Sequence, residues 1–378
     1  MQKIIRWFMV VCIPFFLTGC WDQRLLKEQK IIDLIGYDVG PKGEVVASTS
    51  YPIGMGGSGN LTSSSTTSST SAILTSHGGT AGDTLLQEDL KISEKIDTSK
   101  TQVILFGERI AAKGLYRQLD YIYRNPKGAL GAKVAIIEGS AMDAIRLKQE
   151  EAELNGRYYD EFLKSGVTTG YYTDFNVQVV CPLLLKHTKD PLLPLLKIHS
   201  KGHRAESVGM ALFNNEKMTG KLTIPESMMF ILLSGGIEQK VSFTMRTKQR
   251  YKQNQLNYVI IEILNSRPKT KLNVKNDAVT ANLALKLKYR IREYPKNHLT
   301  SPLLLEQLNN EIKSGLTNTA KKMISKLQEA NCDGFGIEEE IKVHHHRLWE
   351  EKYKNVAIKE IPIKVDLQLE LLNSGIIN

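Results

Sequence analysis

The sequence predicts a mixed α/β protein of the α+β class, and two patterns along the chain indicate it. In the first half, short and wholly apolar stretches at 103–107 and 134–137 alternate with helix-like segments, which is typical of a sheet covered on both faces. In the second half, a strand of alternating apolar and basic residues over 283–292 precedes a long amphipathic helix over 302–329. Three domains are expected in this body: an N-terminal α/β sandwich-like domain over 20–200, a small middle hairpin-plus-helix domain over 201–240, and a C-terminal β-sheet domain over 241–378 crossed by the one long helix.

The N-terminal domain is predicted from its apolar stretches and the segments between them. Its expected strands cover 44–51, 103–107 and 134–137, and its expected helices cover 83–96, 108–123 and 141–147, with Asp83 as the first N-cap. The segment from 160 to 194 has a helical composition, and a proline inside a helix costs about 3 kcal/mol, so a break or a helix start is expected at Pro182. Residues 53–80 are rich in Gly, Ser and Thr and have little to bury, so a flexible loop is expected there.

The middle domain is predicted from a hairpin pattern and a capped helix. An apolar strand over 207–213, a turn at Asn214-Asn215 and a return strand over 217–222 precede a helix that Pro225 opens and Gly235 closes.

In the C-terminal domain, Ser301 is a good N-cap for the long helix, and Pro302 suits its first position. Apolar residues recur three and four apart along this helix: Leu305, Leu308, Ile312, Leu316, Ala320, Met323 and Leu327. A long helix with one such stripe is expected to lie across a sheet. A second helix over 338–349 and an alternating strand over 361–371 close the chain.

The beginning of the chain has the pattern of an export signal. Lys3 and Arg6 precede an apolar run from Trp7 to Leu17, which is too short to cross a hydrocarbon core of about 30 Å as a helix. The small residues before Cys20 make Leu17-Thr18-Gly19-Cys20 resemble the bacterial lipoprotein box, in which the cysteine becomes the mature N-terminus and carries lipid. We therefore expect a signal peptide over 1–19, lipid on Cys20 and a soluble body; a chance cysteine in a plain signal peptide is the alternative.

Metal and redox chemistry are not predicted. Cys181 and Cys332 are far apart in the sequence, and two buried free thiols are expected, although a single disulfide stays possible. Three consecutive histidines, His344 to His346, point about 100° apart on a helix and cannot converge on one tetrahedral ion. Gly54 to Gly59 have the spacing of the dinucleotide-binding fingerprint, but no helix is expected after them, so a nucleotide site is not predicted.

The formal charge of +10 is concentrated in one segment. Residues 240–296 contain fourteen Lys or Arg against three Asp or Glu. Such an excess suits nucleic acid, an anionic membrane surface or an acidic partner, and nucleic acid is not expected for an exported protein without a nucleic-acid motif. The predicted basic face of the strand consists of Lys286, Lys288, Arg290 and Arg292. It is either a solvated outer face or a surface turned toward anionic lipid or an acidic partner.

Several short motifs together resemble those of one protein family. In the first half these are Gly19-Cys20-Trp21-Asp22-Gln23-Arg24, Gly36-Tyr37-Asp38, Gly107-Glu108 and Asp120 through Tyr123-Arg124-Asn125. In the second half they are Gly209 to Phe213, Lys217 to Leu222, and Asp333-Gly334-Phe335-Gly336 followed by Trp349. Their order and spacing resemble the Ger(x)C family, the lipoprotein C subunits of spore nutrient germinant receptors.

This resemblance implies a three-domain mixed α/β body on the outer face of the spore's inner membrane, beside the integral membrane A and B subunits of the same receptor. It implies no catalytic activity and no cofactor, and it assigns only Cys20, as the lipid site. The loop over 53–80 matches none of the motifs. An alternative from another class is a lipid-anchored solute-binding protein that delivers a small ligand to a transporter, which would require two similar α/β lobes around a cleft.

Overall fold

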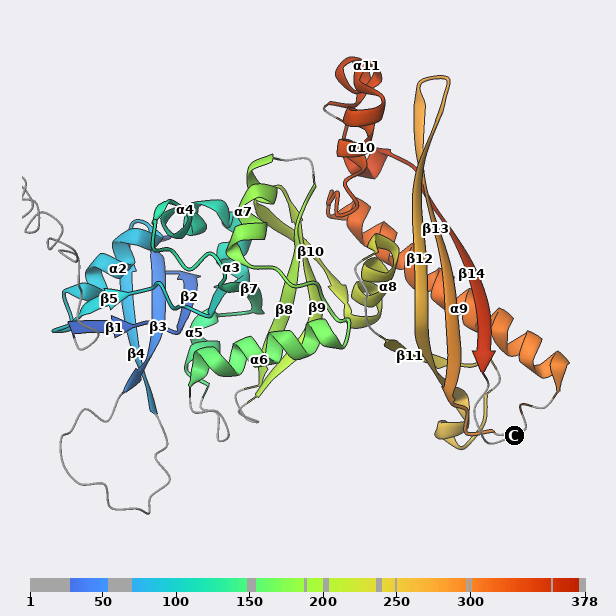
Figure 1. Cartoon of the computed structure of the whole chain (residues 1–378), viewed down its shortest axis with the longest axis horizontal. Helices are drawn as coiled ribbons and strands as arrows, with labels where there is room; N and C mark the ends of the chain where they lie inside the picture. Colours follow the sequence, from blue (N-terminus) through green and yellow to red (C-terminus); the bar gives the residue numbers. More distant parts are fainter. Residues whose placement is uncertain are drawn as a thin grey trace, which may run out of the picture.

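The computed structural model describes residues 28–53, 70–147, 154–186, 189–199, 204–235, 240–248, 250–296, 299, 301–354 and 356–373. The predicted signal peptide, Cys20 and residues 54–69 lie outside this range. The described chain forms an eight-stranded sheet, a four-stranded sheet and a pair of short strands, with helices packed against the large sheets. The large sheets lie toward opposite ends of an elongated molecule (Figure 1). The predicted mixed α/β class is confirmed.

The eight-stranded sheet contains the N-terminal half of the chain. Its strands, in spatial order, are β10 (Lys217–Thr223), β9 (Arg204–Asn214), β8 (Leu192–His199), β7 (Lys133–Glu138), β6 (Val103–Gly107), β2 (Leu34–Val39), β3 (Val45–Ile53) and β4 (Thr70–Gly78). Strands β8, β7, β6 and β2 run parallel, and antiparallel strands flank them on both sides. Every residue of β6 is buried, as expected where helices cover both faces of parallel strands.

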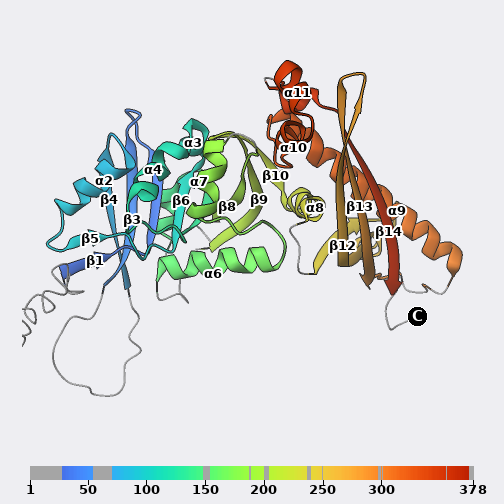
Figure 2. The same cartoon turned by 45° about the horizontal axis from the view of Figure 1, so that its top comes forward.

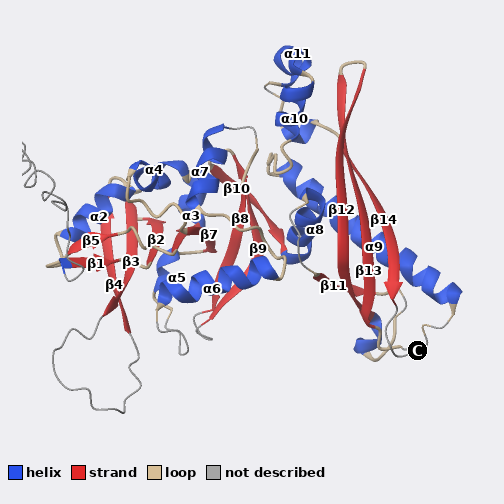
Figure 3. Ribbon diagram, viewed as in Figure 1, coloured by secondary structure: helices blue, strands red, loops and turns tan. Residues whose placement is uncertain are grey.

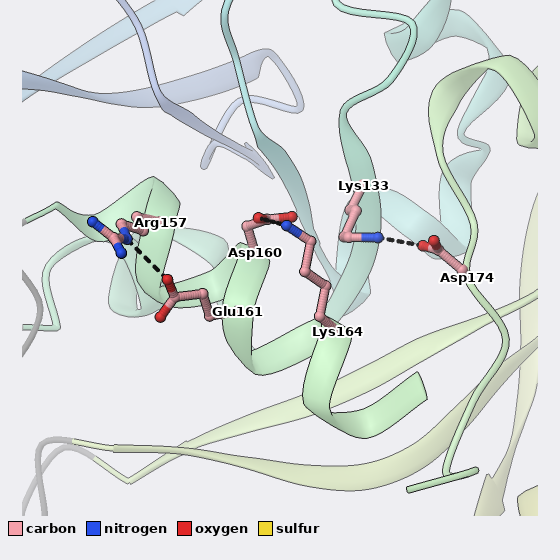
Figure 4. Close-up of polar contacts among 6 residues, drawn as sticks. All are labelled: Lys133, Arg157, Asp160, Glu161, Lys164 and Asp174. Atoms are coloured by element: carbon pink, nitrogen blue, oxygen red, sulfur yellow. Dashed lines mark hydrogen bonds and ion pairs between the residues drawn. The ribbon is translucent and has the colours of Figure 1, made fainter. Parts of the chain in front are cut away.

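Helices cover both faces of this sheet. One face packs against α5 (Ala141–Ile145) and α6 (Asn155–Thr168), and the other packs against α2 (Ala81–Asp89), α3 (Glu108–Lys113), α4 (Tyr116–Arg124) and α7 (Val177–Lys186). Figure 2 shows α6 on one side and α3 and α4 on the other. Ion pairs link residues one turn apart along α6, for example Arg157 with Glu161 (Figure 4). The short strands β1 (Gln29–Ile31) and β5 (Lys95–Asp97) pair in parallel.

Strand β4 corrects the expectation of a loop over the whole of 53–80. Residues 70–78 pair with β3, and α2 packs over this hairpin. The side chains of β4 are mostly small and polar, but Ser76 is fully buried and donates a hydrogen bond to Glu88 Oε1 at 3.1 Å. Backbone pairing and buried hydrogen bonds stabilise this strand. Neither produces the alternation of apolar residues from which a strand is predicted.

Two helices of the N-terminal half differ from the prediction. Helix α2 stops at Asp89, and its N-cap is Thr80, whose Oγ1 accepts from the Asp83 backbone N–H at 3.1 Å. The single helix expected over 108–123 is two helices, because the chain leaves the helical conformation at Gly114, with φ of 124°. A positive φ of this kind favours glycine.

The segment over 160–194 also differs from the prediction. Its last residues begin strand β8, and Pro182 lies inside α7 without ending it. The proline removes one helical hydrogen bond at a cost of about 3 kcal/mol. Val177, Val180 and Leu184 are buried against the sheet, and at about 1.5 to 3 kcal/mol each their burial outweighs that cost.

The hairpin and the helix expected over 201–240 are both present. Strands β9 and β10 form the hairpin, with Asn215 at a φ of 55° in the turn, and α8 (Ile224–Ser234) ends at the left-handed Gly235. The hairpin extends the eight-stranded sheet instead of forming a sheet of its own. Helix α8 is buried from Glu226 to Leu233 and shares one apolar core with both large sheets. The three domains as separate units stay a prediction.

The C-terminal half consists of a four-stranded sheet and one long helix. In spatial order the strands are β11 (Val241–Arg246), β12 (Tyr258–Lys275), β13 (Ala278–Glu293) and β14 (Ile363–Asn373). Strands β12 and β13 form a long antiparallel hairpin, and β14 runs parallel to β13. Helix α9 (Pro302–Glu329) crosses this sheet (Figure 3), with the predicted first and last residues.

The predicted apolar stripe of α9 faces the core. Leu305 is half-buried, and the other stripe residues are buried: Leu308, Ile312, Leu316, Ala320, Met323 and Leu327. They share a core with Leu283, Leu285 and Leu287 of β13. The expectation that this helix lies on a sheet is confirmed.

Short helices connect α9 to the last strand. The predicted helix over 338–349 is divided into α10 (Ile337–His344) and α11 (His346–Leu348), because His345 leaves the helical conformation. A π-helical turn over Trp349–Tyr353 and a 3-10 helix over Ile358–Glu360 follow. A further 3-10 helix, Asn254–Asn257, lies elsewhere, directly before β12. Ile341 and Trp349 pack with Val279 of β13 in a small separate core.

Candidate interaction surface

The candidate surface is the face of the C-terminal sheet that points away from α9. Along β13, the odd-numbered residues from Val279 to Ile291 are buried, while Lys286, Arg290 and Arg292 on the other side are exposed. This alternation is the pattern predicted from the sequence, and it places the four predicted basic residues on one outer face.

The strand register brings further basic residues onto this face. Arg267 of β12 lies directly opposite Lys286, and Lys271 lies opposite Asn282, whose other neighbour is Lys364 of β14. Since side chains alternate along each strand, residues an even number of positions apart share this face, apart from shifts at bulges. The basic residues of the face are Arg246, Arg267, Lys269, Lys271, Lys275, Lys286, Lys288, Arg290, Arg292 and Lys364, and its acidic residues include Glu262, Asp366 and Glu370.

Carboxylates pair with three of the four predicted residues. Arg290 Nε lies 2.6 Å from Glu262 Oε2, and Arg292 Nη1 lies 3.8 Å from Glu262 Oε1. Lys288 Nζ lies 3.1 Å from Glu370 Oε1. Glu262 is only 7% exposed, so its two arginine neighbours compensate a nearly buried charge. Arg290 and Arg292 therefore stabilise the sheet itself, whereas the exposed pair of Lys288 and Glu370 contributes little.

The other basic residues of the hairpin and of β14 have no such partner. Within the described part of the chain, no carboxylate lies within ion-pair distance of a group that we name the distal basic patch: Arg267, Lys269, Lys271, Lys275, Lys286 and Lys364. All six side chains are exposed. Two like charges directly opposite each other in a ladder, such as Arg267 and Lys286, destabilise the pairing. The patch therefore destabilises the strand pairing, and an anionic partner would remove this repulsion.

The predicted lipid site lies outside the described residues, but the other two cysteines of the body are described. Cys181 and Cys332 are free and buried, as expected. Burial raises the pKa of the Cys181 thiol to about 12 and also raises the pKa of Cys332. Neither thiol is activated for nucleophilic chemistry.

The three histidines do not face one another. His344 Nε2 lies 3.4 Å from Glu340 Oε2, and the ring of His346 stacks on Trp349. Over the residues that the structure describes, no group of three or more His, Cys, Asp and Glu side chains could hold a metal ion.

The motif around Asp38 has a structural function. The Asp38 carboxylate accepts hydrogen bonds from the backbone N–H groups of Ala141 and Met142 at 3.0 and 2.9 Å, at the start of α5. It also accepts from Ser140 Oγ at 2.9 Å. A Cβ at Gly107 would lie 2.1 Å from Asp38 Oδ1. Only glycine therefore fits there, and the two motifs join β2, β6 and α5.

The motif around Asp333 connects the two halves of the chain. Its carboxylate accepts from the Ile337 and Glu338 N–H groups at 2.9 and 2.7 Å, which caps α10. Its own N–H donates to Asp190 Oδ2 at 2.7 Å, next to the start of β8. Burial raises the pKa of Asp333 to about 6. The sequence indicated this motif only through its resemblance to a family motif, and it did not predict the role of Asp190.

A buried carboxylate at Glu88 was also missed from the sequence. Glu88 is fully buried beneath β3 and β4, where its oxygens accept from Thr49 Oγ1 at 2.8 Å and Ser76 Oγ at 3.1 Å. Burial raises its pKa from 4.5 to about 7, and the two hydroxyl donors oppose this shift.

The raised pKa of Glu88 predicts a pH-dependent stability. Between pH 4.5 and 7 the folded protein binds the Glu88 proton more tightly than the unfolded chain. The free energy of unfolding should therefore fall as the pH rises through this range, by about 3 kcal/mol at most, and then level off. Denaturant unfolding from pH 5 to 8 measures it. Glu88→Gln should make the slope shallower, most clearly between pH 6 and 7, while Asp333, whose pKa is about 6, keeps part of the slope at lower pH. Glu161→Gln, at the exposed pair of Figure 4, should leave the profile unchanged. An unchanged slope in Glu88→Gln would refute the assignment.

Comparison with known proteins gives family matches along nearly the whole chain. Residues 22–198 match the family model described as the spore germination protein N-terminal domain. Residues 208–375 match the model described as spore germination B3/GerAC like, C-terminal. The chain is 22% identical over 376 residues to the spore germination protein GerQC of Bacillus cereus, covering 98% of this chain and 99% of the relative. It is also 22% identical over 382 residues to the putative spore germination protein YfkR of Bacillus subtilis (strain 168), covering 94% and 93%.

A solved structure shares the fold. The crystal structure of the GerBC protein matches with a TM-score of 0.57 and 16% identity, over 90% of this chain and 97% of that one. The described residues include no helix that is both long and apolar enough to span a membrane. The two family matches follow each other along the chain, and together they identify a spore germination protein. In the structure, the two matched halves share one apolar core through the buried helix α8. The chain belongs to the Ger(x)C family, the C subunits of spore germinant receptors.

Proposed function

We propose that this chain is the lipoprotein subunit of a nutrient germinant receptor, anchored through Cys20 to the outer face of the spore's inner membrane. There it associates with the integral A and B subunits of the same receptor and is needed for their response to nutrients. The observation that carries the proposal is the match along the whole chain to a spore germination protein, 98% of this chain and 99% of the relative. The sequence Leu17-Thr18-Gly19-Cys20 supports the anchor.

The energy of lipid insertion supports the anchor. One acyl chain binds a membrane only marginally, whereas two or more, at about 0.8 kcal/mol for each buried methylene, hold a protein nearly permanently. A lipid-modified Cys20 would therefore confine the body to one membrane surface. Its contribution would be to position or stabilise neighbouring subunits.

The site geometry favours an interaction subunit over an enzyme. The family is one of receptor subunits and is not a known enzyme class. The carboxylates of Asp38 and Asp333 accept backbone hydrogen bonds at the first turns of α5 and α10. Their role is therefore structural. The solute-binding alternative required two similar lobes, and the described sheets differ in strand number and order. No observation therefore favours that alternative.

Cys20→Ala is expected to leave the protein without lipid. The mutant should be extracted from membranes without detergent, and the A and B subunits should no longer be isolated with it. Metabolic labelling with a fatty acid, followed by affinity isolation from spore membranes, measures both effects. Cys12→Ala is the matched control, because it removes a cysteine of the same leader but not the modified one. Lipid label retained on the Cys20→Ala protein would refute the anchor.

A further inference from the structure

We propose that the distal basic patch rests on an anionic phospholipid surface and gives the protein a second, electrostatic contact with the membrane. The patch consists of Arg267, Lys269, Lys271, Lys275, Lys286 and Lys364 on the outer face of β12, β13 and β14. It differs from the basic face predicted from the sequence, because only Lys286 belongs to both. The inference rests on the proposed lipid anchor at Cys20.

The patch has a local excess of positive charge that no carboxylate pairs with in the described part of the chain. Residues two apart on one strand face are separated by about 6.8 Å, and directly opposite residues by about 5 Å. Arg267, Lys269 and Lys271 follow one another at this spacing along β12, with Lys286 opposite the first. Asp366 shares a row with Lys269 but is separated from it by Ala284. These cations therefore repel one another until an anion lies over them.

Protection of sheet edges does not account for the patch. Strand β12 continues past the last residue that β11 pairs with, and lysine and proline on such an edge oppose unwanted pairing. The opposite edge strand, β14, alternates Lys364 with Asp366 and Glu370, so an edge here can be charged with both signs. Lys286 lies on β13 between two strands, where edge protection has no use.

The residue types of the patch indicate the kind of anion that it binds. Five of the six residues are lysines, whose ammonium groups are flexible point charges, whereas specific recognition of a carboxylate favours the bidentate fork of arginine. The neighbouring uncharged residues of the face, Asn282, Ala284 and Gln368, offer no large apolar side chain as an anchor for a protein partner. A diffuse lattice of lipid phosphates fits this arrangement better than one acidic peptide does.

The position of the patch also favours a contact with the membrane. The first described residues, in β1, lie at one end of the elongated molecule, and the four-stranded sheet lies at the other (Figure 1). Cys20 precedes the first described residue, Glu28, by eight positions, so the anchor is tied close to the β1 end. A contact at the far end would make the body lie along the membrane. Because the anchor raises the local concentration of lipid, a weak electrostatic contact is sufficient.

The experiment uses the lipidated protein in vesicles. A dye is attached at Gln368→Cys, which is exposed beside the patch, or at Asn318→Cys, which is exposed on α9 across the sheet. The buried Cys181 and Cys332 should not react. Vesicles contain either equal parts of phosphatidylglycerol and phosphatidylcholine or phosphatidylcholine alone, each with a trace of lipid that carries a quencher on its headgroup. Flotation of the vesicles reports the anchor separately.

The expected result is quenching of the Gln368 dye, but not of the Asn318 dye, and only in the phosphatidylglycerol vesicles. Replacing Lys269, Lys271 and Lys286 with Gln should lower the docking equilibrium constant about 100-fold, since each lysine near an anionic surface contributes about fivefold. Salt at about 0.5 M should have a similar effect. The matched variant, with Lys313, Lys321 and Lys322 of α9 changed to Gln, loses the same charge from the opposite side and should dock normally.

Equal quenching in phosphatidylcholine vesicles would overturn the inference, and so would equal loss of docking in the α9 variant. Quenching that appears only after the A and B subunits are added would also overturn it and would identify an acidic protein partner. Protein that floats with the vesicles but shows no quenching refutes the patch and leaves the anchor intact. Protein that fails to float refutes the anchor instead. Circular dichroism of each variant checks that it is folded.

Discussion

Leu316→Asp is expected to unfold the C-terminal half of the protein at temperatures where the parent is folded. Leu316 is fully buried at the centre of the α9 stripe, among the leucines of β13. The substitution removes about 2 to 3 kcal/mol of apolar burial and places a carboxylate in a site without a compensating charge. A loss of several kcal/mol is a large part of the 5 to 15 kcal/mol that stabilises a typical domain.

Thermal and denaturant unfolding, followed by circular dichroism, measures this effect. Asn318→Asp is the control, because it introduces the same side chain two residues later at an exposed position of α9. The control should melt within a few degrees of the parent. A Leu316→Asp protein that melts like the parent would mean that α9 does not pack on the sheet.

Local signals made α9 and β13 predictable. The helix combines Ser301, Pro302 and a regular apolar stripe within one stretch of sequence, and its observed bounds are the predicted ones. The alternation of Leu283, Leu285 and Leu287 with basic residues likewise depends on β13 alone. Periodicity is sufficient where one face of an element packs on the core and the other is exposed.

Strands β4 and β8 were missed because their signals are not local. The apolar run Leu192–Leu196 is compatible with a buried helix or a buried strand, and pairing with β7 and β9 decides it. Strand β4 has a serine- and threonine-rich sequence, and its burial depends on Glu88, a residue of α2. In both cases the contacts come from residues far along the chain.

For the candidate surface, the sequence predicted which residues share a face but not which of their charges are paired. The strand pattern placed Lys286, Lys288, Arg290 and Arg292 on one face, but it could not show that Glu262 and Glu370 pair with three of them. It also could not show that Arg267 lies opposite Lys286, or that Lys364 lies on the same face opposite Asn282. Register between strands determines which charges are compensated, and the register follows from the fold.

Deleting this chain is expected to abolish germination through its own receptor. If the C subunit positions or stabilises the A and B subunits, its removal leaves that receptor without function, while receptors for other nutrients keep their own C subunits. The effect should therefore be complete for one nutrient and negligible for the others. Such selectivity separates a receptor subunit from a general defect of the spore.

Germination of deletion spores with the receptor's own nutrient tests whether this chain is a required receptor subunit. The loss of optical density and the release of dipicolinic acid follow the response, and a copy of the wild-type gene at another site is the control. We expect no response to that nutrient, a normal response to other nutrients and restoration by the added copy. A normal response of the deletion spores to the receptor's own nutrient would contradict the assignment as a required receptor subunit.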